Sequence, residues 1–385
     1  MTSRLRSSRR IAVAVVMIGL LGACAVLVVL VEAPDSTGGS PGSGAMALSP
    51  SSALPVLHSP VPVLHSAALT PAERTGTHLM SQAEISCGSV TFHGLQVTAW
   101  WGAASQRVSF LEVWHRPGGA IVAEPSDLTG SADEDRPRTS GLPQEQEVMT
   151  ITAPLLALMR ANYVLTYRGR DAIAGRPTVV VEARRRDGSL AARFWLDSAT
   201  KLPLERELYN GKSQLFSRDA FIRVSVGAGQ LRGMPPPDAQ PWTGQLSARN
   251  LTAMRAAGWP LPQAMAAGLT LFQATETTKS GQVVELSYSD GLSVTSVFVQ
   301  RGELPRSMPG WQRLTARGRQ VYARDPDDRS LAWSSRGFVY TVISDAPTAT
   351  IDQVILRLPH DSPAGFWERM GRGLRRIVSW ANPFR

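Results

Sequence analysis

The stretch "RFWLDSATKLPLERELYNGKSQLF" at residues 193–216 decides the fold, because apolar and polar side chains alternate within it. Successive side chains of a β-strand point to opposite faces of the sheet. Phe194 and Leu196 are therefore predicted to share one face, and Trp195 to lie on the other face with Arg193. A strand with one apolar side and one mixed side is typical of a sheet covered on one face.

The second half of this stretch repeats the pattern after a turn. Leu204 and Leu208 share a face with Arg206, and the carboxylates of "PLERELY" lie on the other face. The turn signals "DSAT" at 197–200 and "NGK" at 210–212 separate the apolar runs. A period of two with turn residues between the runs predicts an antiparallel meander.

Further strands and two helices are predicted on the N-terminal side of this meander. Thr70 and Glu73 form a capping-box pattern at the start of "TPAERTGTHLMSQAEI", which predicts a helix. A second, shorter helix is predicted around 152–160. Strand patterns lie at 89–101, 107–115, 163–169 and 176–185.

A second, smaller unit follows a Pro-rich joint at 234–241, "MPPPDAQP". Helices are predicted at about 248–257 and 348–358, and strands near 270–276, 282–288 and 292–300, with more strand patterns to about 344. The sequence therefore predicts an α+β protein with two sheet-containing domains.

The formal net charge of +9 belongs to the two ends of the chain. Four arginines precede residue 11, and five arginines with one glutamate lie within the last twenty residues, which leaves about +1 for the body. A body with so little net charge has no general polyanion-binding surface, so we expect no nucleic-acid partner.

Residues 11–31, "IAVAVVMIGLLGACAVLVVLV", are an uninterrupted apolar run. As a helix, this run is long enough to cross a hydrocarbon core of roughly 30 Å. The preceding arginines predict that the N-terminus stays in the cytoplasm and that the rest of the chain lies outside the cell membrane as a single-pass protein. A cleaved signal peptide and a lipoprotein acylated at Cys24 are the alternatives.

Two further segments are read from composition. Residues 33–69 are rich in Ser, Pro and Gly, which predicts a disordered tether. The stretch "FWERMGRGLRRIVSW" near the C-terminus has an apolar and a basic face, typical of an interfacial helix, although a packed terminal helix fits as well. The predicted membrane-contact residues are Trp367, Arg369, Arg372, Arg375, Arg376 and Trp380.

No motif in the sequence requires catalysis. "SATK" at 198–201 has the Ser-x-x-Lys form of penicillin-binding proteins, whose mechanism needs Ser at a helix start. Here the motif lies between two strands and Leu202-Pro203 follows, so no helix can place Ser198 beside Lys201. We predict no catalytic residue, no metal site and no cofactor, and a buried, inert thiol at Cys87.

Large aromatic side chains on several strands suggest a binding groove on a curved sheet, although ordinary core packing explains them equally well. The candidate groove residues are Trp100, Trp101, Trp114, Phe194, Trp195 and Leu196.

Three segments resemble the RseB/MucB family of extracytoplasmic sigma-factor regulators. They are an Ala-Gly-Arg turn at 174–176, a strand ending Trp-Leu-Asp at 195–197 followed by Leu-Pro-Leu at 202–204, and "LSYSDGLSVTSVFVQRGEL" at 286–304. The resemblance covers roughly 72–345.

The resemblance implies a curved antiparallel sheet like that of the lipoprotein carriers LolA and LppX, an open half-barrel plugged by helices, and a smaller mixed domain. It also implies a negative regulator that binds the outer part of a transmembrane anti-sigma factor and shields it from proteolysis, with lipid-like molecules able to release it. The first alternative function is a lipid or lipoprotein carrier, and the second is a serine acyl enzyme.

The chain is accordingly divided into seven segments. They are a basic stub (1–10), a transmembrane helix (11–32), a linker (33–69), the LolA-like N-terminal domain (70–230), a Pro-rich joint (231–247), the C-terminal domain (248–360) and a basic amphipathic tail (361–385).

Overall fold

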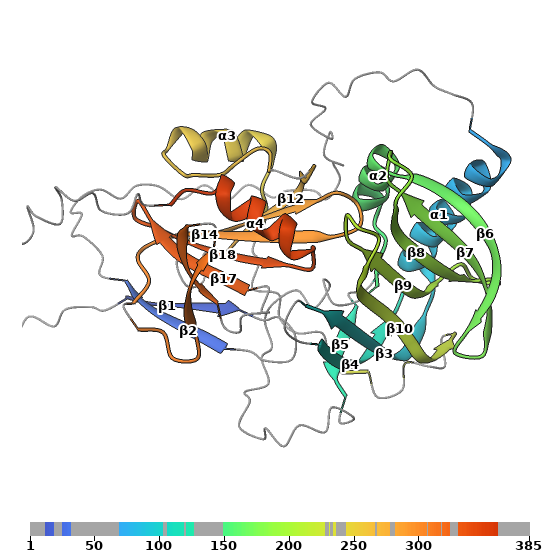
Figure 1. Cartoon of the computed structure of the whole chain (residues 1–385). Helices are drawn as coiled ribbons and strands as arrows, with labels where there is room; N and C mark the ends of the chain where they lie inside the picture. The colour runs from blue at the N-terminus through green and yellow to red at the C-terminus, as the bar shows by residue number, and fades with distance from the viewer. Residues whose placement is uncertain are drawn as a thin grey trace, which may run out of the picture.

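Two eight-stranded antiparallel sheets with helices beside them form the folded part of the chain in the computed structural model (Figure 1). Neither sheet closes into a barrel, and the mixed α+β class agrees with the prediction. The structure describes residues 12–18, 25–31, 69–102, 106–118, 121–126, 149–227, 231, 234–235, 244–265, 268–277, 282–305, 307–316, 318–323 and 330–360. The predicted stub, tail and nearly all of the linker lie outside these residues.

The N-terminal apolar run differs from the predicted helix over 11–32. Two strands, β1 (Ala12–Ile18) and β2 (Ala25–Val31), pair antiparallel there. Among the described residues, no helix has both the length and the apolar character needed to cross a membrane. The run is rich in valine, a β-branched residue that favours strands, and apolar periodicity alone does not separate a buried helix from a pair of apolar strands.

The first sheet contains the predicted meander. Five consecutive strands, β6 to β10, pair as successive hairpins, and β3 continues the sheet beside β10. In spatial order the strands are β5 (Val122–Pro125), β4 (Gln106–His115), β3 (Phe92–Trp101), β10 (Leu215–Val226), β9 (Pro203–Tyr209), β8 (Leu190–Asp197), β7 (Arg176–Arg184) and β6 (Val164–Ile173).

The Ala-Gly-Arg motif forms a two-residue hairpin loop between β6 and β7. Ile173 and Arg176 pair across it, and Ala174 and Gly175 have φ values of 49° and 73°. Such a turn needs positive φ at both loop residues, and its twist matches that of the flanking strands. The motif is therefore explained by backbone geometry.

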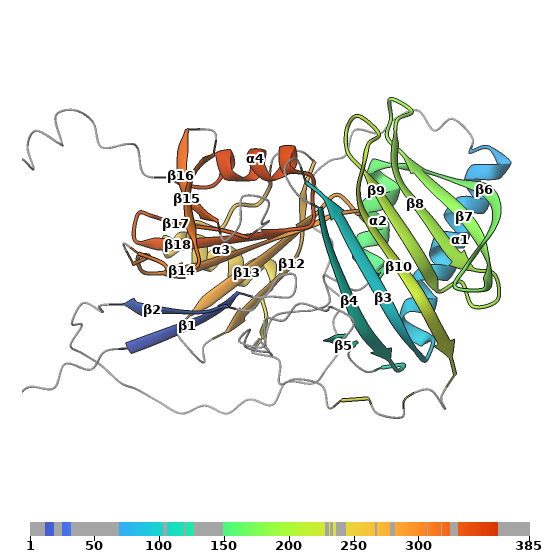
Figure 2. The same ribbon diagram turned by 60° about the horizontal axis from the view of Figure 1, so that its bottom comes forward.

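Two helices lie inside the curve of this sheet (Figures 1 and 2). Helix α1 (Pro71–Ser89) begins with the predicted capping box, in which the Thr70 amide donates to the Glu73 carboxylate at 2.7 Å. Helix α2 (Ala153–Asn162) matches the shorter predicted helix. Both helices share one apolar core with the sheet, so its inner face is covered by helices, as the family resemblance implied. We call this face the concave face and its opposite the outer face.

The second sheet has helices α3 (Ala248–Ala256) and α4 (Thr348–Arg357) packed on one core with it, close to the predicted positions. Tyr288, Tyr340 and Val354 are fully buried in this core. In spatial order the strands are β11 (Gly244–Gln245), β12 (Thr270–Thr277), β13 (Val283–Ser289), β14 (Val294–Arg301), β18 (Phe338–Ser344), β17 (Ser330–Ser335), β16 (Arg319–Ala323) and β15 (Gln312–Ala316).

Candidate functional site

The six candidate groove residues do not lie on one face of the first sheet. In β8, Phe194 and Leu196 belong to the core formed with α1 and α2. Trp195 lies between them in sequence and so points to the outer face, as alternation predicted. One strand thus divides the candidate set between two surfaces.

Strand register divides the other three tryptophans in the same way. Opposed residues of an antiparallel pair share a face. Leu208 of the concave core is opposite Ser217, and Ser217 is opposite Trp100, so Trp100 is on the concave face. Trp101 follows Trp100 directly and is on the outer face.

Trp114 is the third tryptophan of this group. Its neighbour Val113 belongs to a buried cluster of the concave face, so Trp114 is on the outer face. There its ring stacks on that of His93, with ring centroids 4.8 Å apart. The concave group is therefore Trp100, Phe194 and Leu196, and the outer group is Trp101, Trp114 and Trp195.

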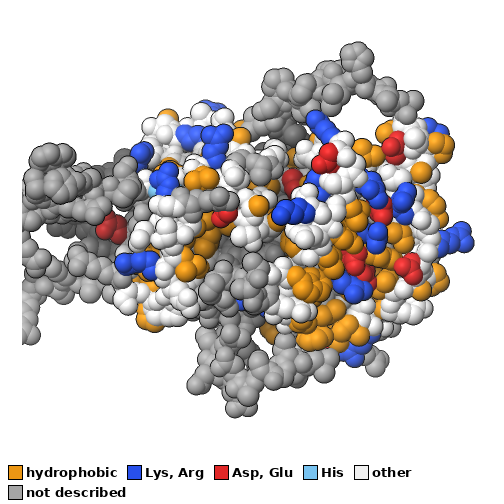
Figure 3. All heavy atoms as spheres, in the orientation of Figure 1, with side chains coloured by type: hydrophobic (Ala, Val, Ile, Leu, Met, Phe, Trp, Pro, Cys, Tyr) orange, Lys and Arg blue, Asp and Glu red, His pale blue; other side chains and the backbone are white. Residues whose placement is uncertain are grey.

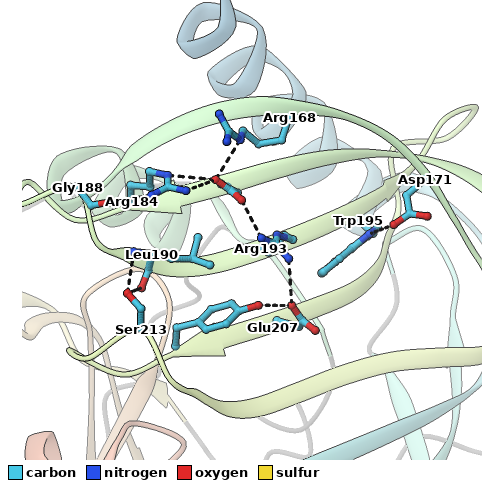
Figure 4. A network of polar contacts seen from close by, with 11 residues as sticks. Arg168, Asp171, Arg184, Gly188, Leu190, Arg193, Trp195, Glu207 and Ser213 are labelled. Atoms are coloured by element: carbon cyan, nitrogen blue, oxygen red, sulfur yellow. Dashed lines mark hydrogen bonds and ion pairs between the residues drawn. The ribbon is translucent and has the colours of Figure 1, made fainter.

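Trp195 is held in a fixed orientation on the outer face. Its indole nitrogen donates to Asp171 of β6 at 2.9 Å, and the Arg193 guanidinium carbon lies 5.6 Å from its ring centroid (Figure 4). The hydrogen bond from Trp195 lowers the pKa of Asp171. Only 7% of Trp195 is exposed, so its ring supports the surface and leaves little area for a ligand.

A ladder of alternating charges lies beside Trp195, and three of its arginines, Arg168, Arg184 and Arg193, turn toward one carboxylate (Figure 4). That carboxylate belongs to Glu182 of β7. Glu182 accepts hydrogen bonds from Arg184 at 2.8 Å and Arg193 at 2.9 Å, and Arg168 lies 3.2 Å away. Burial acts to raise the pKa of Glu182, but the bonds from Arg193 and Arg184 hold it below its ordinary value. The carboxylate therefore remains ionised and forms ion pairs with three arginines.

The ladder continues across β9 and β10 and is electrically balanced. Tyr209 donates to Glu207, and Arg218 donates to Glu205 at 2.8 Å. Burial raises the pKa of Glu205, while Arg218 opposes that shift. Positive and negative side chains alternate over this face (Figure 3). Because each charge has an opposite partner nearby, the ladder is a surface of low net charge.

The outer face becomes apolar beyond the ladder. Its residues over β3 and β4 form what we call the outer-face patch, and Val108 is 43% exposed. Orange side chains gather at the lower edge of this domain in Figure 3. Contiguous exposed apolar area of this kind marks interaction surfaces. The patch consists of Val97, Ala99, Trp101, Val108 and Phe110.

The Ser-x-x-Lys motif forms a tight turn between β8 and β9. Asp197 organises this turn, because its carboxylate accepts from the Thr200 amide at 2.8 Å and from Arg176 at 2.7 Å. Lys201 has a φ of 65°, and its ammonium donates to the backbone carbonyl of Ser198. An acyl enzyme of this class requires the serine and the lysine one turn apart on a helix. Here both residues lie in a strand-to-strand turn, so that arrangement is not formed.

A buried ion pair lies on the concave face and was not predicted from the sequence. Arg206 of β9 donates to Asp219 of β10 at 2.7 Å, and their side chains are 14% and 2% exposed. Burial acts to lower the pKa of the Arg206 guanidinium, but the charges of Asp219 and the nearby Asp345 raise that pKa. The guanidinium is therefore a fixed cation at the edge of an apolar core.

The turn between β13 and β14 of the second domain reaches this edge. Leu292 is 6% exposed and belongs to the apolar core of the first domain with α1, α2 and Phe194. Its carbonyl oxygen lies 3.5 Å from the Arg206 guanidinium. The second domain thus supplies one side chain to the core of the first, and burying a leucine contributes about 1.5–3 kcal/mol. We call residues 289–293 the junction turn.

Polar contacts hold the junction turn against the end of α2. The Tyr163 hydroxyl donates to one oxygen of Asp290 at 2.6 Å, and the Asn162 amide donates to the Asp290 carbonyl at 2.9 Å. Burial, followed by the charge of Asp290, raises the pKa of Tyr163, so its hydroxyl remains a donor. The other Asp290 oxygen accepts from the Leu292 amide at 2.9 Å.

Gly291 allows the junction turn to approach α2 closely. Its φ is 101°, and a β carbon added there would lie 2.2 Å from the Met159 nitrogen. A non-glycine side chain at this position is excluded both by backbone conformation and by space. The "SDGLS" segment noted in the sequence is therefore a docking element, a role that its turn residues alone did not reveal.

The predicted membrane-contact residues at 367–380 lie outside the described residues. Within the part of the chain that the structure describes, no three His, Cys, Asp or Glu side chains gather as metal ligands would.

Comparison with known proteins confirms the family resemblance. The model of the MucB/RseB N-terminal domain matches residues 135–252. The sigma factor AlgU regulatory protein MucB of Pseudomonas aeruginosa is 28% identical over 209 residues, which are 52% of this chain. The chain covers 62% of that relative's length, so more than a third of the relative has no counterpart in the match.

Two groups of solved structures also match. The MucA/MucB complex structure of Pseudomonas aeruginosa matches at 22% identity and a TM-score of 0.41, covering 75% of this chain and 99% of the matched chain. The LolA superfamily protein NE2245 of Nitrosomonas europaea matches at 8% identity and a TM-score of 0.20, covering 70% of this chain and 91% of the other.

Proposed function

We propose that this chain, whose residues 135–252 match the MucB/RseB N-terminal domain, is a membrane-anchored extracytoplasmic regulator of a sigma factor. It acts by binding the outer part of a transmembrane anti-sigma factor and shielding that part from proteolysis. The observation that carries this proposal is the family match, together with the MucB relative named for regulation of a sigma factor.

The geometry supports binding over catalysis. The charged residues of the first sheet pair with one another, as the Glu182 and Glu205 contacts show. The one motif with catalytic form is a strand-to-strand turn held by Asp197. The exposed and half-buried apolar side chains of the outer-face patch are suited to recognition.

We assign the outer-face patch to the partner. Its apolar residues are exposed or half-buried, whereas the neighbouring ladder presents charges that are already neutralised. A core of apolar contacts with a polar rim is the usual composition of a protein interface. The anti-sigma segment is expected to place apolar side chains over Trp101, Val108 and Phe110.

The carrier alternative has less support. A carrier needs a concave face open to cargo, and here α1, α2 and Leu292 pack onto that face. Of the candidate groove residues, Phe194 and Leu196 are part of this packed core. We retain Trp100, Phe194 and Leu196 as the residues a lipid-like signal would reach if the core opened.

Anchoring in the cell membrane is proposed on the sequence. Residues 11–31 are apolar throughout and follow four arginines, a pattern typical of a single-pass anchor with a cytoplasmic N-terminus. The basic residues of the tail, with Trp367 and Trp380, are proposed to contact anionic headgroups.

Capture of a partner tests the proposal. The purified full chain in phosphatidylcholine nanodiscs should bind the extracytoplasmic fragment of an anti-sigma factor encoded beside its gene. Val108→Asp should weaken this binding at least tenfold, because it places a charge in the patch. The matched control is Val164→Asp, at a valine of the same sheet that is 38% exposed but lies on edge strand β6. Failure of the wild-type chain to bind would refute the regulator function, and equal effects of both variants would refute the assigned surface.

A further inference from the structure

One edge of the first sheet is only partly paired. Strand β4 (Gln106–His115) pairs with β3 along its whole length, but β5 pairs only with residues 111–114 (Figure 2). Among the described residues, no strand pairs with Gln106–Ser109 on that side. We call the backbone of these four residues the open edge.

The last hydrogen bond between β4 and the chain after β5 shows which backbone groups the open edge presents. The Ser126 amide donates to the Phe110 carbonyl at 2.9 Å, so the backbone groups of Phe110 point toward the β5 side. In an antiparallel ladder, the N–H and C=O of one residue point to one side of the strand and those of the next residue to the other. Val108 and Gln106 therefore direct their backbone groups to the open edge, where each offers one donor and one acceptor.

The side chains beside the open edge are apolar on the outer face. Val108 of the outer-face patch is 43% exposed, whereas Trp114, on the same face of the same strand but beside β5, is buried. An added strand would continue the patch, because its alternate side chains would lie beside Val108 and Phe110.

The open edge also lacks the usual protection of an edge strand. Exposed edges are commonly protected by proline, by a bulge or by several charged side chains. Residues 106–109 contain no proline, and β4 pairs with β3 without a bulge. Arg107 is the one charged residue among them, and alternation directs its side chain away from the outer face. The edge is therefore suited to accept another strand.

We propose that the open edge binds the anti-sigma factor by strand addition. An extended, proline-free segment of the anti-sigma factor pairs with Gln106 and Val108 through main-chain hydrogen bonds, and it places apolar side chains at alternate positions beside the outer-face patch. In this mode of recognition the main chain supplies affinity and the alternate side chains supply specificity. The identity of the partner rests on the proposed function, whereas the mode of binding rests on the geometry of β4.

A second copy of the chain fits the open edge less well than a separate segment does. Antiparallel self-pairing centred on Val108 would place Gln106 of one copy opposite Phe110 of the other. The Phe110 carbonyl already accepts from Ser126, so that position is taken. A segment of another protein carries no such neighbour and can pair along the whole open edge.

A proline substitution tests the main-chain bond directly. Val108→Pro removes the N–H that faces the open edge, and proline is tolerated at an edge position whose N–H faces solvent. The matched control is Val108→Ala, which also removes the valine side chain but keeps the N–H. With the full chain in phosphatidylcholine nanodiscs, Val108→Pro should bind the anti-sigma fragment about tenfold more weakly than Val108→Ala, because one hydrogen bond is lost and an acceptor of the fragment is left unpaired. Equal affinities of the two variants would overturn strand addition.

Residue-resolved hydrogen exchange of the wild-type chain gives the same answer without a substitution that could disturb the sheet. In the free chain the Val108 amide should exchange fast and the Ser109 amide, which points toward β3, slowly. Saturation with the fragment should slow exchange at Val108 by about tenfold or more and leave Ser109 unchanged. A Val108 amide that is protected in the free chain would overturn the proposal, and protection that grows with the concentration of the free chain would assign the edge to a second copy.

The two proposals fail in different ways. If the wild-type chain binds the fragment while the Val108 amide stays unprotected, the regulator function stands and strand addition is wrong. If the wild-type chain binds no fragment, the regulator function is refuted together with the partner assigned to the open edge.

Discussion

Removing the cation of the buried ion pair should destabilise the first domain far more than removing an exposed cation of the same sheet. Arg206 donates two hydrogen bonds to Asp219, at 2.9 and 2.7 Å. In Arg206→Met the methionine fills much of the same volume, but Asp219, whose side chain is 2% exposed, is left without its cation. The variant therefore isolates the cost of an unpaired buried carboxylate.

The magnitude follows from the burial of the pair. Breaking a buried ion pair by removing one partner costs about 3–5 kcal/mol. At about 2–4 °C per kcal/mol for a domain of this size, the midpoint of thermal unfolding should fall by roughly 6–20 °C. Replacing both residues, as Arg206→Met with Asp219→Leu, should recover most of this loss, because no charge is then left unpaired.

The assay is thermal unfolding of the full chain followed by circular dichroism, with urea unfolding to obtain the free energy. Arg223→Met is the surface control, because Arg223 pairs with Glu112 but is 66% exposed. Exposed pairs contribute about 0–1 kcal/mol, so this variant should change little. If Arg206→Met and Arg223→Met had equal effects, or if the double variant were less stable than the single one, the assignment of a costly buried charge would be wrong.

Four further outcomes are expected. Burial raises the pKa of Cys87 to about 12, so its thiol should resist iodoacetamide at mildly alkaline pH in the folded chain and react once guanidinium chloride unfolds it; equal rates would show an accessible thiol. Burial acts to raise the pKa of Asp197, but hydrogen bonds from Arg176 and Thr200 lower it. The stability that Asp197 contributes to the fold is therefore present above the ordinary pKa of about 3.9 and is lost as the pH falls through the lowered pKa. Urea titrations at several pH values should show a full stability difference between wild type and Asp197→Asn at neutral pH and none in acid. Ser198→Ala should leave partner capture intact, and fluorescent penicillin should not label the wild-type chain, whereas covalent labelling at Ser198 would restore the enzyme hypothesis. A reporter fused after residue 40 should be active only if it is a type that works outside the cytoplasm, and an active cytoplasmic reporter there would reverse the proposed topology.

Most of the first sheet was predictable because its signals are local. The meander from β6 to β10 has a clear period of two, with turn residues at each reversal, and the faces of Phe194 and Trp195 follow directly. The start of α1 was predictable because the Thr70–Glu73 capping box is contained in four residues. Where one strand or one helix end determines the answer, the sequence alone is sufficient.

The division of the tryptophans was not predictable in the same way. Trp100 and Trp101 are adjacent, and each fits either face of β3, which has large apolar side chains on both sides. Their assignment depends on register with β10, and β10 contains a bulge between Phe221 and Arg223 that shifts its pairing with β3. Register between strands more than a hundred residues apart has no local signal. The apolar run at 11–31 is predicted as a membrane-spanning helix from its length, whereas the structure pairs Ala12–Ile18 with Ala25–Val31 as strands.

The junction turn shows why a local reading of a motif can be correct and still miss its role. "SDGLS" satisfies every requirement of a tight β-turn: Asp290 caps it and Gly291 supplies positive φ. Yet a turn needs neither the tight approach to Met159 nor the burial of Leu292, and both arise from another domain. The close approach to Met159 acts on Gly291, which the turn itself already requires, so turn chemistry conceals that constraint. Substitution separates the two roles, because Leu292→Ala leaves the turn residues unchanged and alters only the contact with the first domain.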